Sequence, residues 1–103
     1  MTQTLDLTSL ARFNPSRHQV QLLQDADPLR VALICLEAGQ EVARHTTTSH
    51  VLLYVVEGKG RITVGDAVSE VGPGQLVLCP PEIPHSIVGE ERMLVLAAIA
   101  PRP

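Results

Sequence analysis

Three of the four histidines in this chain stand beside turn-forming residues, where side chains from different strands can meet. His45 and His50 flank a run of three threonines and a serine, and His85 follows the rigid sequence Pro80-Pro81-Glu82-Ile83-Pro84. Neutral imidazole is the commonest metal ligand, and a metal site needs three or four such groups that converge. Spacing alone does not show convergence, so a metal site and three unrelated turn histidines both remain open at this point.

Glycine and proline divide the chain into short runs rich in valine, isoleucine and leucine, which is typical of an all-β sandwich or barrel. The sequence predicts strands near residues 18–23, 29–37, 40–44, 51–57, 60–64, 67–71, 75–79, 85–88 and 92–99. Gly65-Asp66 suits a two-residue hairpin turn, because glycine accepts a positive φ at the first turn position. Gly72-Pro73-Gly74 predicts a second tight turn, and residues 5–12 have room for one turn of helix. At 103 residues we expect a single domain.

Three of the predicted strands do not alternate apolar and polar residues. The runs Val31 to Leu36, Val51 to Val56 and Met93 to Ala100 are apolar throughout. Successive side chains of a strand point to opposite faces, so both faces of these strands are predicted to be dry. A small barrel buries one face internally, and we expect the other to pack on a second copy, giving a homodimer. The alternative cover is the N-terminal segment, but residues 1–17 offer few apolar groups.

The composition argues against two classes of partner. The net charge is −3, Lys and Arg total only 8, and aromatic residues make up 2%, so a nucleic-acid partner is not expected. The first residues lack the basic start and apolar core of a signal peptide, and no apolar run is long enough to span a bilayer, so no membrane association is expected. Cys35 and Cys79 stand alone in separate predicted strands, which favours a cytoplasmic protein with reduced thiols.

The spacing around the histidines resembles the two motifs of the cupin superfamily. In the first, Gly39 is followed at the family's intervals by His45, Thr47, Val51 and Gly58. In the second, the matching positions are Gly74, Pro80, Glu82, His85 and Gly89. The resemblance implies an all-β, single-domain cupin-like barrel, that is, a double-stranded β-helix or jelly roll, formed by residues 1–103 with its motif-bearing core at 29–99.

The resemblance also implies a metal set of three histidines and one glutamate, which this chain keeps only in part. Thr47 replaces the second histidine and Val51 replaces the glutamate. His50 lies one residue before Val51, and strict alternation would turn it to the opposite face. A β-bulge within residues 46–49 would re-aim it inward and complete a site of His45, His50 and His85 with an open position. Such a site suits Zn, Fe, Ni, Mn or Cu without choosing among them.

Two functions follow from these residues as hypotheses. The first is a metal-binding cupin-like protein, with the ion in the barrel and a small-molecule ligand or substrate at the open position. The second is a metal-free small-molecule binding or sensor module, or a purely structural dimer with a degenerate site. Whether the chain is an enzyme stays open. We expect Leu53, Val55, Leu76 and Leu78 to line or back the pocket, Tyr54 to face outward, and Cys79 to be a small buried apolar side chain.

Overall fold

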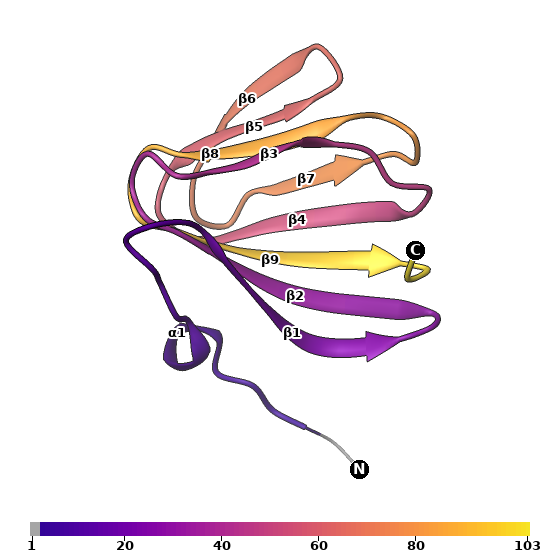
Figure 1. Cartoon of the computed structure of the whole chain (residues 1–103), viewed down its shortest axis with the longest axis horizontal. Coiled ribbons are helices and arrows are strands. Elements are labelled where there is room, and N and C mark those ends of the chain that lie inside the picture. Colours follow the sequence, from indigo (N-terminus) through magenta and orange to yellow (C-terminus); the bar gives the residue numbers. More distant parts are fainter. Residues whose placement is uncertain (1–2) are drawn as a thin grey trace.

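The structure, a computed structural model, describes residues 3–103 and arranges nine strands in two sheets that face each other (Figure 1). One short helix precedes them, α1 (Leu7–Leu10). The strands are β1 (Gln19–Ala26), β2 (Leu29–Leu36), β3 (Glu41–His45), β4 (His50–Glu57), β5 (Gly60–Val64), β6 (Ala67–Val71), β7 (Leu76–Cys79), β8 (His85–Gly89) and β9 (Met93–Ala100). Within the described residues, no helix has the length and apolar character that crossing a membrane requires.

The structure confirms the all-β prediction and each predicted strand. The other boundaries move by at most one residue, but β1 continues to Ala26, three residues beyond its predicted end. It does so because β1 and β2 form a hairpin whose ladder runs up to the pair Ala26 and Leu29. The turn at Gly65-Asp66 is also confirmed, since Gly65 has a φ of +60° between β5 and β6.

The two sheets differ in strand number, and every pairing is antiparallel. The larger sheet has the order β1-β2-β9-β4-β7, and the smaller one has the order β3-β8-β5-β6. β9 lies in the middle of the larger sheet, between β2 and β4, although it is the last strand along the sequence. Strands far apart in the chain are therefore neighbours in space.

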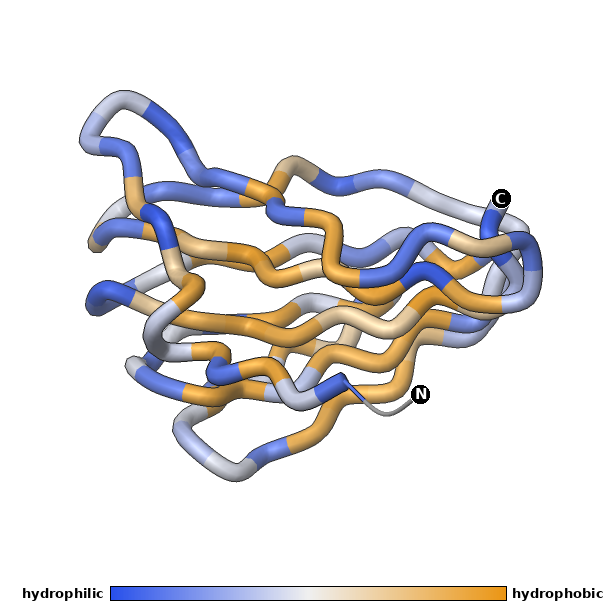
Figure 2. The backbone as a smooth tube through the Cα atoms, turned by 90° about the horizontal axis from the view of Figure 1, so that it is seen from below, coloured by the Kyte–Doolittle hydropathy of each residue, from blue (hydrophilic) through white to orange (hydrophobic). Residues whose placement is uncertain are grey.

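The core lies between the sheets and is filled by alternate residues of each strand. From β4, Val51, Leu53 and Val55 point inward and are at most 6% exposed. They meet Ile62 and Ile87 of the smaller sheet in one apolar cluster. Figure 2 shows apolar residues running along the strands and polar residues gathered in the connections at their ends. Burial of this cluster is the main stabilising contribution to the fold.

The outer face of the larger sheet is covered in part by the N-terminal segment, which corrects the expectation that residues 1–17 offer too little apolar surface. Leu33, Cys35 and Leu94 form a second buried cluster on this face. Side chains of the N-terminal segment pack against it, namely Leu7, Leu10, Ala11 and Phe13. Leu23 and Val56 pack against the same cluster, so the N-terminal segment has to cover only the rest of it.

Glycine is required at Gly58, in the turn between β4 and β5. Its φ is +80°, and a Cβ there would lie 1.9 Å from the carbonyl oxygen of Arg92 and 2.8 Å from the Cα of Met93. Backbone atoms cannot move aside as a flexible side chain can. The start of β9 therefore passes this turn at a distance that only a residue without a Cβ permits. This explains the last glycine of the first motif.

Gly58→Ala should destabilise the protein by more than about 3 kcal/mol, because a left-handed backbone and a backbone collision act together. Gly74→Ala is the matched control, since Gly74 has a φ of +87° but nothing within 4 Å of the added Cβ. The control should cost only about 1–2 kcal/mol. Urea unfolding of both variants measures the difference, and equal losses would contradict the close approach at Gly58.

Candidate functional site

His45 and His85 lie opposite each other because their strands pair. β3 runs antiparallel to β8, and the Cα atoms of the two histidines are partners across the ladder. The ring centroids are 4.4 Å apart, and the rings meet edge to face at an interplanar angle of 64°. Two imidazoles that are distant in the sequence are thus brought into direct contact.

A β-bulge directs His45 toward its partner, but it lies elsewhere than the sequence suggested. The register of β3 shifts between Val42 and His45, where Val42 opposes Ile87 and His45 opposes His85. His45 is three residues after Val42 along β3, whereas His85 is only two residues from Ile87 along β8. The strand β3 therefore contains one extra residue, which is a bulge. Without it, Val42 and His45 would face opposite sides of the strand, whereas both line the same cavity.

Backbone hydrogen bonds join the loop before His85 to the loop after His45 and to the turn between β5 and β6. The N–H of Glu82 donates to the carbonyl of Thr47 at 2.8 Å, and the N–H of Gly65 donates to the carbonyl of Pro84 at 2.8 Å. Glu82 has a φ of 69°, in the left-handed region where glycine is favoured. It stands at the glycine position of the second motif, so the backbone there keeps the glycine conformation although the side chain has changed. Glu82 itself is exposed.

The same ring nitrogen of each histidine is engaged by the backbone. Nδ1 of His45 is 2.9 Å from the carbonyl oxygen of Ala43, and Nδ1 of His85 is 3.3 Å from that of Ile83. A carbonyl oxygen only accepts, so Nδ1 carries the proton in both contacts and Nε2 of the neutral ring is the acceptor. His85 is 3% exposed, and burial, with His45 beside it, lowers its pKa. The His85 ring is therefore neutral near pH 7.

Both imidazoles line a cavity of about 460 Å³ between the sheets. Thr46, Thr47 and Thr48 edge it on one side, and Arg30 also contributes. The remaining lining is apolar and comes from both sheets: Ile34, Val42, Val51, Leu53, Ile87, Ala97, Ile99 and Pro103. Its size and its few polar groups in an apolar wall are typical of small-molecule sites. Arg30 was not predicted to line the cavity. Alternation along β2 could have indicated it, because Ala32 and Ile34 face inward and Arg30 lies on the same side of the strand.

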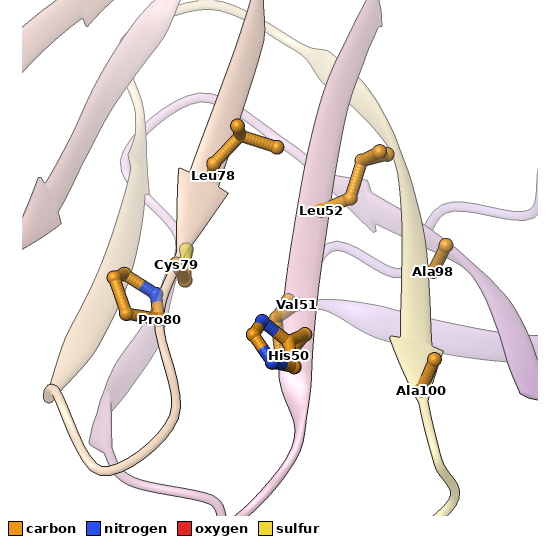
Figure 3. Close-up of a pocket in the computed structure, with 8 residues that line it drawn as sticks. All are labelled: His50, Val51, Leu52, Leu78, Cys79, Pro80, Ala98 and Ala100. Carbon is orange, nitrogen blue, oxygen red and sulfur yellow. The ribbon is translucent and has the colours of Figure 1, made fainter.

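His50 is not brought to the other two histidines. The pairing of β4 with β9 runs without interruption from His50 to Val55, so His50 and Val51 face opposite sides. Val51 faces the core and the cavity, while His50 lines a separate apolar depression on the outer face of the larger sheet. Figure 3 shows His50 there beside Leu52 of the same strand, with Leu78 on β7 and Ala98 on β9. The three-histidine arrangement that a bulge at 46–49 would give is not formed.

The remaining positions of the implied metal set do not supply ligands. Val51 has no donor atom, and the hydroxyl of Thr47 already accepts a hydrogen bond from the N–H of Ser49 at 3.2 Å. A hydroxyl is also a poor ligand for first-row transition metals. Among residues 3–103, no three His, Cys, Asp or Glu side chains are grouped so that they could hold an ion. The pocket offers two imidazoles, fewer than the three protein ligands of a catalytic zinc site.

Several other expectations concerned residues near the pocket. Leu53 lines the cavity and Val55 lies in the core behind it, but Leu76 and Leu78 face outward and are 52% and 67% exposed, which corrects their predicted place. They pair with Tyr54 and Leu52, the outward residues of β4. Tyr54 faces outward as expected. Cys79 is buried in the core cluster, and burial raises the pKa of its thiol, so it is an apolar side chain and not a reactive thiolate.

Comparison with known proteins agrees with this architecture. The family model described as a cupin domain matches residues 32–99. A solved protein from Thermus thermophilus is 28% identical, with a TM-score of 0.94 over 99% of this chain and 100% of that chain. An RmlC-like cupin protein from Desulfovibrio desulfuricans is 27% identical, with a TM-score of 0.90 over 98% of each chain.

More distant structures share the fold alone. The salicylate 1,2-dioxygenase of Pseudoaminobacter salicylatoxidans is 19% identical, with a TM-score of 0.76 over 81% of this chain and 25% of that chain. No curated protein sequence matches this chain. The family match covers most of the strands and both histidine motifs. The chain therefore belongs to the cupin domain family, as the spacing of its glycines and histidines predicted.

Proposed function

We propose that this protein binds a small, mainly apolar molecule in the cavity between its sheets, and that His45 and His85 recognise a hydrogen-bond donor on that molecule. The observation that carries the proposal is that both rings contact a backbone carbonyl through the same nitrogen, Nδ1. Each Nδ1 is held by a backbone carbonyl, which leaves each Nε2 as an acceptor in a cavity that is otherwise mainly apolar. Hydroxyl, phenol and amide N–H groups are the donors that suit such acceptors.

The surroundings of His85 strengthen this assignment. His85 is only 3% exposed and the cavity wall around it is mainly apolar, so a hydrogen bond from a ligand is electrostatically stronger there than at the surface. The apolar wall supplies affinity through the area it removes from water, and the imidazoles supply selectivity. The threonines at residues 46–48 add hydroxyl groups at one side of the cavity.

Phenol and anisole test this selectivity, because they share one ring and differ in the donor. We expect phenol to bind about fivefold more tightly, as one neutral hydrogen bond contributes ~1 kcal/mol. Amide chemical shifts measured by NMR titration report both affinities. The preference should disappear in a His45→Ala/His85→Ala variant and persist in the control His50→Ala, whose side chain lies on the outer face. Equal affinities in the natural protein would contradict the proposal.

A resident metal ion was the first hypothesis from the sequence, and the residues present do not fit it. The cavity provides two imidazoles, while the positions that would complete the set hold Thr47 and Val51. We therefore propose a metal-free site and assign no step to a metal.

Purified protein should contain well below one transition-metal ion per chain, because two imidazoles leave most of the coordination shell to water. Elemental analysis after expression in medium supplied with Zn, Fe, Ni, Mn and Cu measures this content. One ion per chain that is lost in His45→Ala/His85→Ala and kept in His50→Ala would overturn the metal-free assignment and restore the metal site on these two histidines.

We also propose a homodimer formed through the part of the outer face that the N-terminal segment leaves uncovered. The outward residues there are His50, Leu52 and Tyr54 of β4, Leu76 and Leu78 of β7, and Leu96, Ala98 and Ala100 of β9. None of these is Asp, Glu, Lys or Arg, so the same face of a second copy can approach without repulsion between like charges. A large apolar face on a small protein favours an interface over exposure to water.

Leu78→Glu should convert the dimer into a monomer, because a carboxylate would be buried at the contact without a partner. Val68→Glu is the matched control, since Val68 is 61% exposed on β6 of the other sheet. Sedimentation velocity compares the two variants with the natural chain. If the natural chain sediments as a monomer at every concentration tested, the proposed interface is wrong.

The cytoplasm is proposed as the location on the chemistry of the two cysteines. Cys35 lies in the cluster under the N-terminal segment, and Cys79 lies in the core between the sheets. Both are free and buried, and burial raises the pKa of each thiol. Because they face opposite sides of the larger sheet, this fold cannot join them by a disulfide, and a reducing compartment suits them.

A further inference from the structure

The residues after β9 are held at the cavity by three successive contacts. The buried hydroxyl of Ser49, a residue only 1% exposed, donates to the carbonyl of Pro101. The N–H of Arg102 donates to the carbonyl of Asp27 at 2.9 Å. Pro103 then lines the cavity that also contains His45 and His85. Residues 101–103 thus run from the end of β9 to the β1–β2 hairpin, beside which the C-terminus lies in Figure 1.

Ion pairs fix the middle residue of this segment. The guanidinium of Arg102 donates to the carboxylate of Asp25 at 3.1 Å and also to the carboxylate of Asp27. Asp25 is shared with Arg30, whose Nε lies 3.2 Å from the same oxygen and which itself lines the cavity. The pKa of Asp25 is lowered by Arg102 first and then by Arg30, so this carboxylate is charged at neutral pH.

These contacts differ in strength, and the difference defines a hinge. The bond from Ser49 to Pro101 is buried, whereas the carboxylates that hold Arg102 are exposed, Asp27 to 90% of its side-chain surface. Exposed ion pairs contribute little and are weakened by salt, but a buried hydroxyl that loses its partner is costly. Arg102 and Pro103 can therefore detach, with loss of the ion pairs and of the one backbone bond from Arg102 to Asp27, while Pro101 stays in place and the sheets remain paired.

We propose that residues 101–103 form a strap across the cavity, and that Arg102, through Asp25 and Asp27, controls access to His85. The proposal rests on the binding role proposed for the cavity and adds its gate. When the strap is closed, Pro103 is part of the cavity wall and limits the size of a bound molecule. When Arg102 releases the hairpin, that side of the cavity opens and the His85 ring becomes reachable.

Acylation of histidine by diethyl pyrocarbonate, read for each histidine by mass spectrometry, tests the gate without any ligand. In Arg102→Ala the rate at His85 should rise about fivefold, the change expected when a network of exposed ion pairs is lost. The rate at His50, on the outer face, should not change. Asp27→Asn should raise the rate at His85 in the same direction, because it weakens the same contact from the other side.

Arg61→Ala is the matched control, since Arg61 is also ion-paired, with Glu70 and Glu90, but on the other sheet. It should leave the His85 rate at the natural value. Labelling of the buried thiol of Cys79 reports on opening of the whole core, and it should stay slow in every variant. An unchanged His85 rate in Arg102→Ala, or a parallel rise at Cys79, would overturn the strap. Neither result depends on whether phenol is preferred over anisole, so this proposal and the proposed function can fail separately.

Discussion

The pairing of β3 with β8 is the interaction on which the pocket depends. β3 is an edge strand that pairs, within residues 3–103, with β8 alone, and this ladder sets His45 opposite His85. The bulge before His45 turns its ring to the inner side, and the hydrogen bond from Glu82 to Thr47 joins the loop before β8 to the loop after β3. If this ladder slipped by one residue, His45 and Val42 would exchange faces with their neighbours, and the cavity would lose one of its two imidazoles.

The strands could be predicted from the sequence because their signals are local. Glycine and proline mark the ends of most runs, and Gly65-Asp66 specifies its hairpin through the backbone freedom of one residue. The opposite orientations of His50 and Val51 also follow from simple alternation along β4. The bulge in β3 has no such signal, since Ala43 and Arg44 are ordinary strand residues, and it becomes visible only in the register against β8.

Contacts between distant segments could not be predicted from the sequence, because no local signal indicates which segments meet. Leu7, Leu10 and Phe13 cover Leu33 and Leu94, but nothing near residue 7 indicates which strands it meets. Arg102 finds Asp25 and Asp27 only because β9 ends next to the hairpin of β1 and β2. The absence of a complete metal set was readable at Thr47 and Val51, whereas the hydrogen-bonding state of the two remaining rings required the positions of the carbonyls of Ala43 and Ile83.

The central position of β9 affects how the larger sheet forms during synthesis of the chain. A ribosome makes β2 and β4 long before β9, so their facing edges stay unpaired until the last strand has emerged. Both of these early strands are apolar on two sides, which makes the incomplete sheet prone to association with other chains. We infer that the larger sheet is completed only after β9 itself has been made, by insertion of β9 between strands that already exist.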